Sequence, residues 1–149
     1  MLGALGALEA RGTTALAAAV GAAAARGRPG VLAVLSDFLD EGPWQQALQR
    51  ARAAGHDLVL VQVLTRDELD PALEGDWLLE DSETGRTVDL GAEPEALAAY
   101  RSALAALCAS VHRVARAAGG VYVRAPTDEA LEPPVRRILS RQSDAAVPA

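Results

Sequence analysis

The most constraining feature of the chain is a run of five apolar residues, Val31–Leu35, which follows a Pro-Gly pair and ends on Ser36 and Asp37. An uninterrupted apolar run of this length predicts a strand buried on both faces, as in parallel sheets that are covered by helices. Ligands of open α/β sheets bind at the carboxyl ends of the strands. We therefore expect Ser36, Asp37 and Asp40 to lie at a ligand-binding edge.

Other segments predict helices and strands that alternate along the chain. The alanine-rich stretch Ala15–Arg26 predicts a helix with Thr13 or Thr14 as its N-cap. Further helices are predicted over Trp44–Ala54, over Glu95–Ala118, and from an N-cap at Thr127-Asp128 to Leu139; further strands are predicted over Asp57–Leu64 and Val121–Val123.

The segment between residues 69 and 94 breaks this alternation and predicts a β-hairpin inserted at the ligand edge. Trp77–Glu80 and Arg86–Leu90 have the character of strands, and Asp81-Ser82-Glu83-Thr84-Gly85 between them has the composition of a turn. Gly85 would supply the positive φ that such a turn requires.

These elements predict an α/β fold with a doubly wound, mostly parallel sheet, helices on both faces and the inserted hairpin. The 149 residues suggest one domain over residues 1–139, with 140–149 as a disordered tail. Three strands are few for such a sheet, and Val31–Leu35 is too apolar to be stable as a free edge. We expect something to pair with it, either another strand or a second copy of the chain.

Composition narrows the classes of partner. The formal net charge of -6 and the sequence pI of about 4.9 argue against nucleic acid or an anionic membrane. The sequence has no signal-peptide pattern and no membrane-spanning run of about 18 apolar residues, so we expect a soluble, cytoplasmic protein. The single cysteine, Cys108, falls within an apolar helical pattern, which predicts a buried and inert thiol.

The residues that could support chemistry are oxygen ligands. The chain has no phosphate-binding glycine loop and no nucleophile elbow, and neither His56 nor His112 is placed for a catalytic triad. Thr14, Ser36, Asp37 and Asp40 could meet at one sheet edge as a set of hydroxyls and carboxylates suited to Mg²⁺ or Mn²⁺. Alternatively, Thr14 is only an N-cap, and the two aspartates only accept hydrogen bonds from loop amides.

Several motifs resemble those of von Willebrand factor A-like domains. Arg11–Ala19 resembles their G-G-T-D-L-A-A-A-L segment, and Val34–Asp40 resembles their V-L-S-D-F-L-D strand and loop. The chain resembles more closely the bacterial family called domain of unknown function fifty-eight. Gly55-His56-Asp57, Asp81–Gly85 and Tyr122-Val123 stand where that family has a G-H-x-V strand, a D-x-E-T-G hairpin and a final Y-V strand.

This resemblance implies a metal-ion-dependent adhesion site, in which Thr14 matches the family's threonine and Asp37 its aspartate. The D-x-S-x-S loop of that site does not occur in the sequence. The chain therefore resembles the carboxyl-terminal part of a family member, and the absent first strand would pair with Val31–Leu35. We expect Thr14, Ser36 and Asp37 to form an incomplete Mg²⁺ site.

The resemblance further implies a non-enzymatic protein–protein interaction domain that acts with a MoxR-type AAA+ ATPase in a chaperone-like or assembly system. The metal would connect Thr14 and Asp37 to a carboxylate of the partner. One alternative is a metal-dependent phosphoester hydrolase that uses Asp37 with Asp40 or Asp67. It is disfavoured, because no basic cluster at that edge would hold a phosphate and no histidine is placed as an acid. The other is a fragment without independent activity, whose edge at Val31–Leu35 is covered by self-association or by the absent part.

Overall fold

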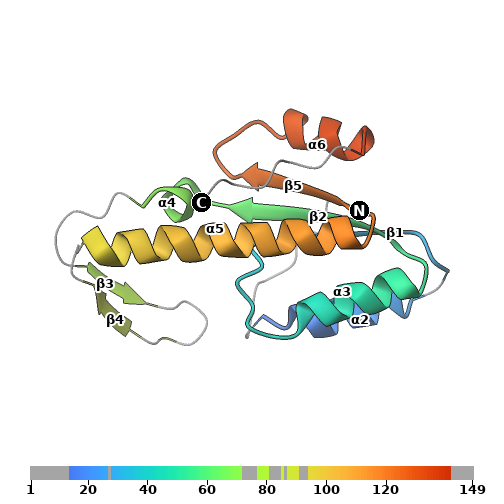
Figure 1. Ribbon diagram of the computed structural model, residues 1–149, viewed down its shortest axis with the longest axis horizontal. Coiled ribbons are helices and arrows are strands. Elements are labelled where there is room, and N and C mark those ends of the chain that lie inside the picture. Colours follow the sequence, from blue (N-terminus) through green and yellow to red (C-terminus); the bar gives the residue numbers. More distant parts are fainter. Residues whose placement is uncertain are drawn as a thin grey trace.

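A parallel sheet of three strands forms the centre of the fold. The computed structural model describes residues 14–26, 28–71, 77–80, 85, 87–90 and 94–141. Its strands β1 (Val31–Ser36), β2 (Asp57–Leu64) and β5 (Val121–Pro126) lie in the order β1-β2-β5 (Figure 1). All three predicted strands are confirmed. The third strand is longer than predicted, because its pairing with β2 continues as far as Leu64 and Pro126.

Helices cover the two faces of this sheet unequally. On one face lie α2 (Leu16–Ala24), α3 (Trp44–Ala53) and α5 (Pro94–Ala117), while α6 (Glu132–Leu139) packs on β5 from the other face. A short helix, α4 (Arg66–Leu69), follows β2 directly. An α/β fold with helices on both faces is thus confirmed. None of the described helices combines the length and apolar character needed to cross a lipid bilayer.

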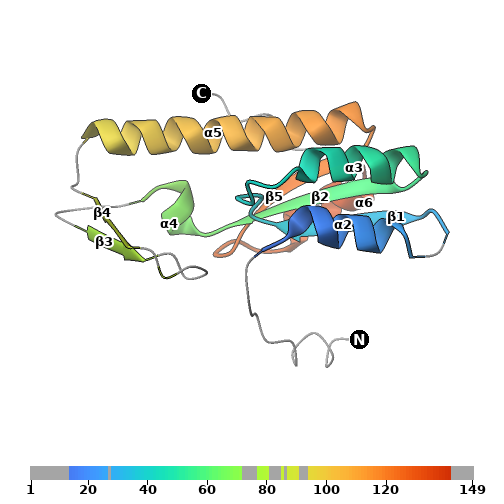
Figure 2. The same ribbon diagram turned by 90° about the horizontal axis from the view of Figure 1, so that it is seen from below.

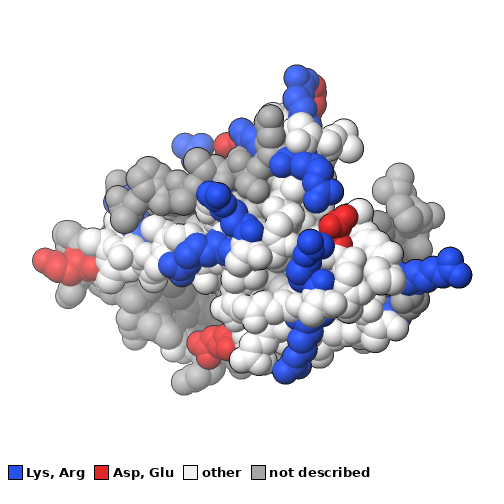
Figure 3. Space-filling model, turned by 45° about the vertical axis from the view of Figure 1, so that its right-hand side comes forward, with Lys and Arg blue, Asp and Glu red and all other residues white. Residues whose placement is uncertain are grey.

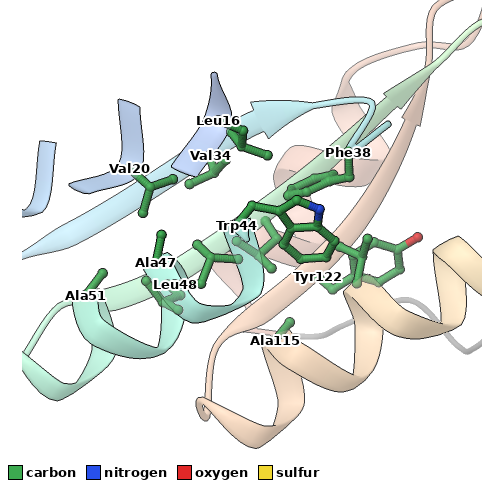
Figure 4. Close-up of a cluster of buried hydrophobic side chains, with 13 residues drawn as sticks. Leu16, Val20, Val34, Phe38, Trp44, Ala47, Leu48, Ala51, Ala115 and Tyr122 are labelled. Atoms are coloured by element: carbon green, nitrogen blue, oxygen red, sulfur yellow. The ribbon is translucent and has the colours of Figure 1, made fainter. Parts of the chain in front are cut away.

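The larger core lies between the sheet and helices α2, α3 and α5 (Figure 4). Leu48, Leu60 and Val111 are fully buried there, and the rings of Phe38, Trp44 and Tyr122 fill the carboxyl-terminal end of the same cluster. Since apolar burial is the main force that holds such layers together, this face fixes how α2, α3 and β1 sit relative to one another.

The opposite face has a smaller core that does not extend to β1. Val61, Val121, Val123 and Ala125 are buried there beneath α6. On β1, by contrast, Val31 is 71% exposed and Leu35 is 67% exposed. The expectation that Val31–Leu35 is buried on both faces is therefore wrong for the described residues. The physical reason is its position, because β1 ends the strand order and α6 lies over β5.

Two helices begin differently from the sequence-based expectation. The N-cap of α2 is Ala15, which provides no side-chain hydrogen bond, so Thr14 is not its cap, and Thr13 lies outside the described residues. Helix α6 begins at Glu132 and not after Thr127-Asp128. The amide of Thr127 donates instead to the Leu64 carbonyl at 2.9 Å, which extends the path of β5 and delays the helix until two prolines occupy its first turn.

The predicted hairpin is present as β3 (Trp77–Glu80) and β4 (Thr87–Leu90), which pair antiparallel. Gly85 has φ +67, as expected for its turn, whereas 81–84 and 86 lie outside the described residues. Both views place the hairpin near the amino end of α5, beyond the carboxyl ends of β1 and β2 (Figures 1 and 2). Most of the predicted tail, residues 142–149, also lies outside the described residues.

Candidate functional site

In the loop that follows β1, side-chain oxygens accept hydrogen bonds from backbone amides of the same loop. The Phe38 amide donates to the Ser36 Oγ at 3.0 Å, and the Leu39 amide donates to the Asp37 Oδ1, also at 3.0 Å. The Ser36 hydroxyl donates to the same Asp37 oxygen at 3.4 Å. Ser36 and Asp37 are thus brought together at the carboxyl end of β1, as predicted, and much of their hydrogen-bonding capacity is used within the loop.

Asp40 connects this loop to the beginning of α2. Its Oδ2 accepts a hydrogen bond of 2.6 Å from the Leu16 amide, 24 residues earlier, and its Oδ1 accepts one from the Gly42 amide. Asp40 therefore supplies the acceptor that an N-cap side chain would otherwise provide. This bond holds the loop beside the start of α2, two residues from the exposed Thr14.

Phe38, at the centre of the loop, has an unusual backbone conformation. Its φ is +64, in the left-handed region that bulky residues rarely adopt. Its side chain is 1% exposed, and its ring meets that of Trp44 edge-on, with the centroids 5.2 Å apart. Backbone strain of this kind costs about 1–3 kcal/mol and persists only where surrounding contacts enforce it. Burial of Phe38 against Trp44 is such a contact.

A buried polar pair supports the loop from below. Gln62 in β2 is fully buried, and its Nε2 donates to the Asp37 carbonyl at 3.0 Å. Its Oε1 accepts a hydrogen bond of 2.7 Å from the hydroxyl of Tyr122 in β5. Neither Gln62 nor Tyr122 is among the site residues expected from the sequence. A usable signal was present, because a glutamine inside the apolar run Asp57–Leu64 must find hydrogen-bond partners when it is buried.

Cys108 of α5 lies close to this polar pair and is buried, as predicted. Burial raises the pKa of its thiol, an effect that the nearby Arg124 opposes in part. The thiol is therefore held in its protonated, less reactive form at neutral pH. On the same helix, the ring of His112 packs against Tyr122, with the ring centroids 5.6 Å apart.

The acidic residues after β2 are engaged mainly in local structure. Thr65 and Glu68 form a reciprocal capping box at the start of α4. The Glu68 carbonyl accepts a hydrogen bond from the Tyr100 hydroxyl at 2.8 Å, and Asp70 pairs with Arg101 at 2.7 Å, so that both contacts tie α4 to α5. Asp67 is exposed, and no contact within the described residues joins it to Asp37.

The expected Mg²⁺ site has few ligands among the described residues. Within residues 14–26, 28–71 and the other described ranges, no group of three or more His, Cys, Asp or Glu side chains could hold a metal ion. Thr14, Ser36 and Asp37 offer two hydroxyls and one carboxylate, whereas Mg²⁺ takes about six oxygen ligands. On their own, these residues do not complete a magnesium site. The assignment stays a prediction that needs oxygen ligands from elsewhere.

Neither histidine lies at this edge in a catalytic arrangement. His56 is buried at the opposite, amino end of the sheet, where its Nδ1 accepts from the Gly30 amide at 3.4 Å. Its Nε2 lies 3.1 Å from the Ala24 carbonyl, and this geometry requires the neutral tautomer with the proton on Nε2. His56 thus connects the end of α2 to the beginning of β1.

Comparison with known proteins finds uncharacterized relatives in mycobacteria. Rv1480 of Mycobacterium tuberculosis (strain ATCC 25618 / H37Rv) and Mb1516 of Mycobacterium bovis are each 32% identical over 119 residues, which make up 79% of this chain. The uncharacterized protein MAV169 of Mycobacterium avium is 33% identical over 101 residues, which are 68% of this chain and 59% of that protein. The match spans only 37% of the length of Rv1480 and Mb1516.

The chain also matches a protein-family model, whereas no solved structure matches it significantly. The model, described as "Protein of unknown function DUF58", matches residues 2–113. That stretch contains α2, β1, the loop with Asp37 and Asp40, β2, the hairpin and most of α5. The chain therefore belongs to the family of proteins of unknown function DUF58.

Proposed function

We propose that this chain is a von Willebrand factor A-like domain that binds other proteins and catalyses no reaction. The observation that carries the proposal is the open apolar edge of β1, where Val31 and Leu35 are 71% and 67% exposed. Parallel strands are ordinarily covered on both faces, and an uncovered apolar edge is a template for another strand. Both side chains lie on the face of β1 that the smaller core does not reach, and a strand paired beside β1 would contact their flanks and reduce their exposure.

The direction of the crossovers supports a strand at this edge. Helix α3 connects β1 to β2 across the face that also carries α2. Nearly all crossovers between parallel strands are right-handed. Suppose that α2 likewise connects an earlier parallel strand to β1 by a right-handed crossover. That earlier strand would then lie beside β1, on the side opposite to β2. The open edge lies on that side, and such a strand would come from outside the described residues or from a second copy.

The resemblance to von Willebrand factor A-like domains suggests the partner. It points to a MoxR-type AAA+ ATPase in a cytoplasmic chaperone-like or assembly system. In this proposal a cation at Thr14, Ser36 and Asp37 would be completed by oxygen ligands from the partner. The loop contacts and the Asp40–Leu16 hydrogen bond support it, because they keep Asp37 close to the start of α2.

The same contacts disfavour the alternative of a phosphoester hydrolase. Both carboxylate oxygens of Asp40 accept hydrogen bonds from backbone amides, so this side chain already has a structural role. His56 lies at the other end of the strands, and His112 packs on Tyr122. The described residues therefore offer Asp37 no evident acid–base partner.

The test compares two exposed leucines. The solution mass of the chain, alone and with a purified MoxR-type ATPase, is measured across a range of concentrations for wild type, Leu35→Lys and Leu131→Lys. The controls match, because Leu35 and Leu131 are 67% and 70% exposed. We expect the wild type and Leu131→Lys to associate equally, and Leu35→Lys to weaken association about tenfold or more. If the wild type stays monomeric and does not bind the ATPase, the proposal is refuted.

The cation is tested separately, by calorimetric titration with Mg²⁺ in the presence of the associated partner. We expect Thr14→Ala and Asp37→Ala to lower Mg²⁺ affinity, and Asp67→Ala, an exposed carboxylate of the same edge, to leave it unchanged. Equal affinity in all three variants would show that the site is misassigned, while leaving the β1 edge as an interaction surface.

A further inference from the structure

We infer that the amino edge of the parallel sheet is a docking surface for an acidic, carboxylate-rich segment of a partner protein. Seven exposed arginines lie at this edge, at the ends of helices α2, α3, α5 and α6 and in the turn before β1. We call this group the arginine edge; its members are Arg26, Arg28, Arg50, Arg52, Arg113, Arg116 and Arg141.

The positive charge of the arginine edge is mostly unpaired. Asp57, at the start of β2, lies 3.2 Å from Arg52 and 3.9 Å from Arg141. None of the other five arginines forms an ion pair with any residue that the structure describes. Figure 3, which brings this side of the molecule forward, shows arginine side chains gathered here with few acidic side chains between them.

The helix dipoles at this edge neutralise only part of the positive charge of the arginines. The carboxyl ends of α2, α3 and α5 point to the same edge, and arginines stabilise such ends. Each helix end carries a partial charge of about -0.5, so with Asp57 they offset about two to three of the seven positive charges. Counting only the described residues, an excess of about four positive charges is left at one edge of a chain whose formal net charge is -6.

This chemistry favours carboxylates over phosphates. Phosphate groups are commonly bound by amides at helix amino ends, whereas helices end at this edge with their carbonyls. The described aromatic side chains lie in the core or towards the carboxyl end of the sheet, so that no base-stacking platform accompanies the arginines. Guanidinium groups pair with carboxylates in a bidentate geometry, as they do with phosphates, so this pairing is compatible with the acidic segment but does not select it.

Part of the arginine edge is positioned by contacts that are partly buried. His56 accepts a hydrogen bond from Gly30 and lies against the Ala24 carbonyl, on either side of the turn that carries Arg26 and Arg28. Arg52 is fixed by Asp57 and by the His56 carbonyl, to which its Nη1 donates at 3.4 Å. A surface that is fixed before binding loses less conformational entropy when a partner docks.

The test measures binding of a fluorescent poly-L-glutamate peptide to the whole chain by anisotropy. Its comparators are a single-stranded oligonucleotide of equal charge and vesicles that contain phosphatidylserine. We expect the peptide to bind more tightly than either comparator, and its affinity to fall several-fold between about 50 and about 300 mM salt as screening increases. Arg50→Glu/Arg116→Glu should weaken binding about tenfold or more, because like charges then face each other.

The matched control is Arg66→Glu/Arg101→Glu, which changes the charge equally at sites beyond the opposite, carboxyl end of β2, where each arginine makes only an exposed ion pair. Circular dichroism verifies folding, and Arg26→Glu/Arg28→Glu replaces the first variant if that one unfolds. Equal loss in variant and control, or tighter binding of the oligonucleotide or the vesicles, would overturn the inference. The arginine edge uses none of the residues on which the proposed function rests, so either can fail alone.

Discussion

The hydroxyl of Tyr122 donates a hydrogen bond of 2.7 Å to Oε1 of Gln62, and both side chains are buried. Gln62 in turn donates to the carbonyl of Asp37, so two neighbouring strands hold the loop that follows a third. In a low-dielectric interior such bonds are strong, and losing one partner is costly. The candidate site is therefore coupled to the core through its backbone as well as through the ring of Phe38.

Tyr122→Phe is expected to destabilise the chain by about 1–3 kcal/mol, because it leaves the buried Gln62 oxygen without the tyrosine donor. The free energy of unfolding in urea measures the effect. Tyr100→Phe is the matched control, since it deletes the same hydroxyl from an exposed hydrogen bond to the Glu68 carbonyl. The Tyr100 variant should lose less than about 1 kcal/mol. Equal losses in both variants would contradict the role given to the buried pair.

Asp40→Ala is expected to destabilise the chain by about 0.5–2 kcal/mol, the usual cost of losing an N-cap acceptor. The loss arises at α2, although Asp40 lies 24 residues away from Leu16. Glu41→Ala removes the neighbouring exposed carboxylate and should change stability little. Hydrogen exchange adds a local readout, because the α2 amides should lose protection in the Asp40 variant alone. Unchanged α2 protection in that variant would show that the carboxylate does not cap the helix.

The sequence was most informative where structure depends on neighbours along the chain. Strand β2 has the predicted bounds, Asp57–Leu64, because an apolar run lies there between turn and helix-start signals. The exposure of β1 could not be predicted in the same way, because burial depends on which strand or helix lies beside it. The cap of α2 was missed for a related reason, since the acceptor comes from a distant loop and not from Thr14.

The candidate site was predicted in part. The sequence placed Ser36, Asp37 and Asp40 at the carboxyl end of β1, and they lie there. It left open whether the two aspartates hold a cation or accept hydrogen bonds from loop amides. The structure shows such bonds to Asp37 and to Asp40, around the left-handed backbone at Phe38 that the sequence did not reveal. The family resemblance implied a bound cation. The contacts show that several of the oxygens that would bind it already accept hydrogen bonds from loop amides.

Cys108 is expected to be inert to disulfide reagents in the folded chain and to react only on unfolding, because its thiol is buried and protonated. Burial raises the pKa of this thiol in the folded chain, so the protonated thiol favours the folded state. This contribution to the free energy of unfolding is fully present below about pH 8.5, the ordinary thiol pKa, and is lost as the pH rises through the folded pKa. Urea unfolding at neutral and alkaline pH should show this loss in wild type. A Cys108→Ala variant should show less of it, and an equal alkaline loss would contradict the assignment.

Two glycines should respond in opposite directions to the same substitution. A Cβ at Gly120 would lie 2.6 Å from the Leu58 carbonyl oxygen and 3.0 Å from the Leu58 Cβ, so that β2 and the turn before β5 would have to separate. Gly120→Ala is therefore expected to cost about 1–3 kcal/mol, as for other overpacked sites. A Cβ at Gly21, in the middle of α2, would meet no described atom within 4 Å beyond the backbone of its own helix, so Gly21→Ala should stabilise by about 0.5–1 kcal/mol through helix propensity. Urea unfolding measures both, and a stabilising Gly120→Ala would mean that α5 and β5 do not approach β2 as closely as this packing requires.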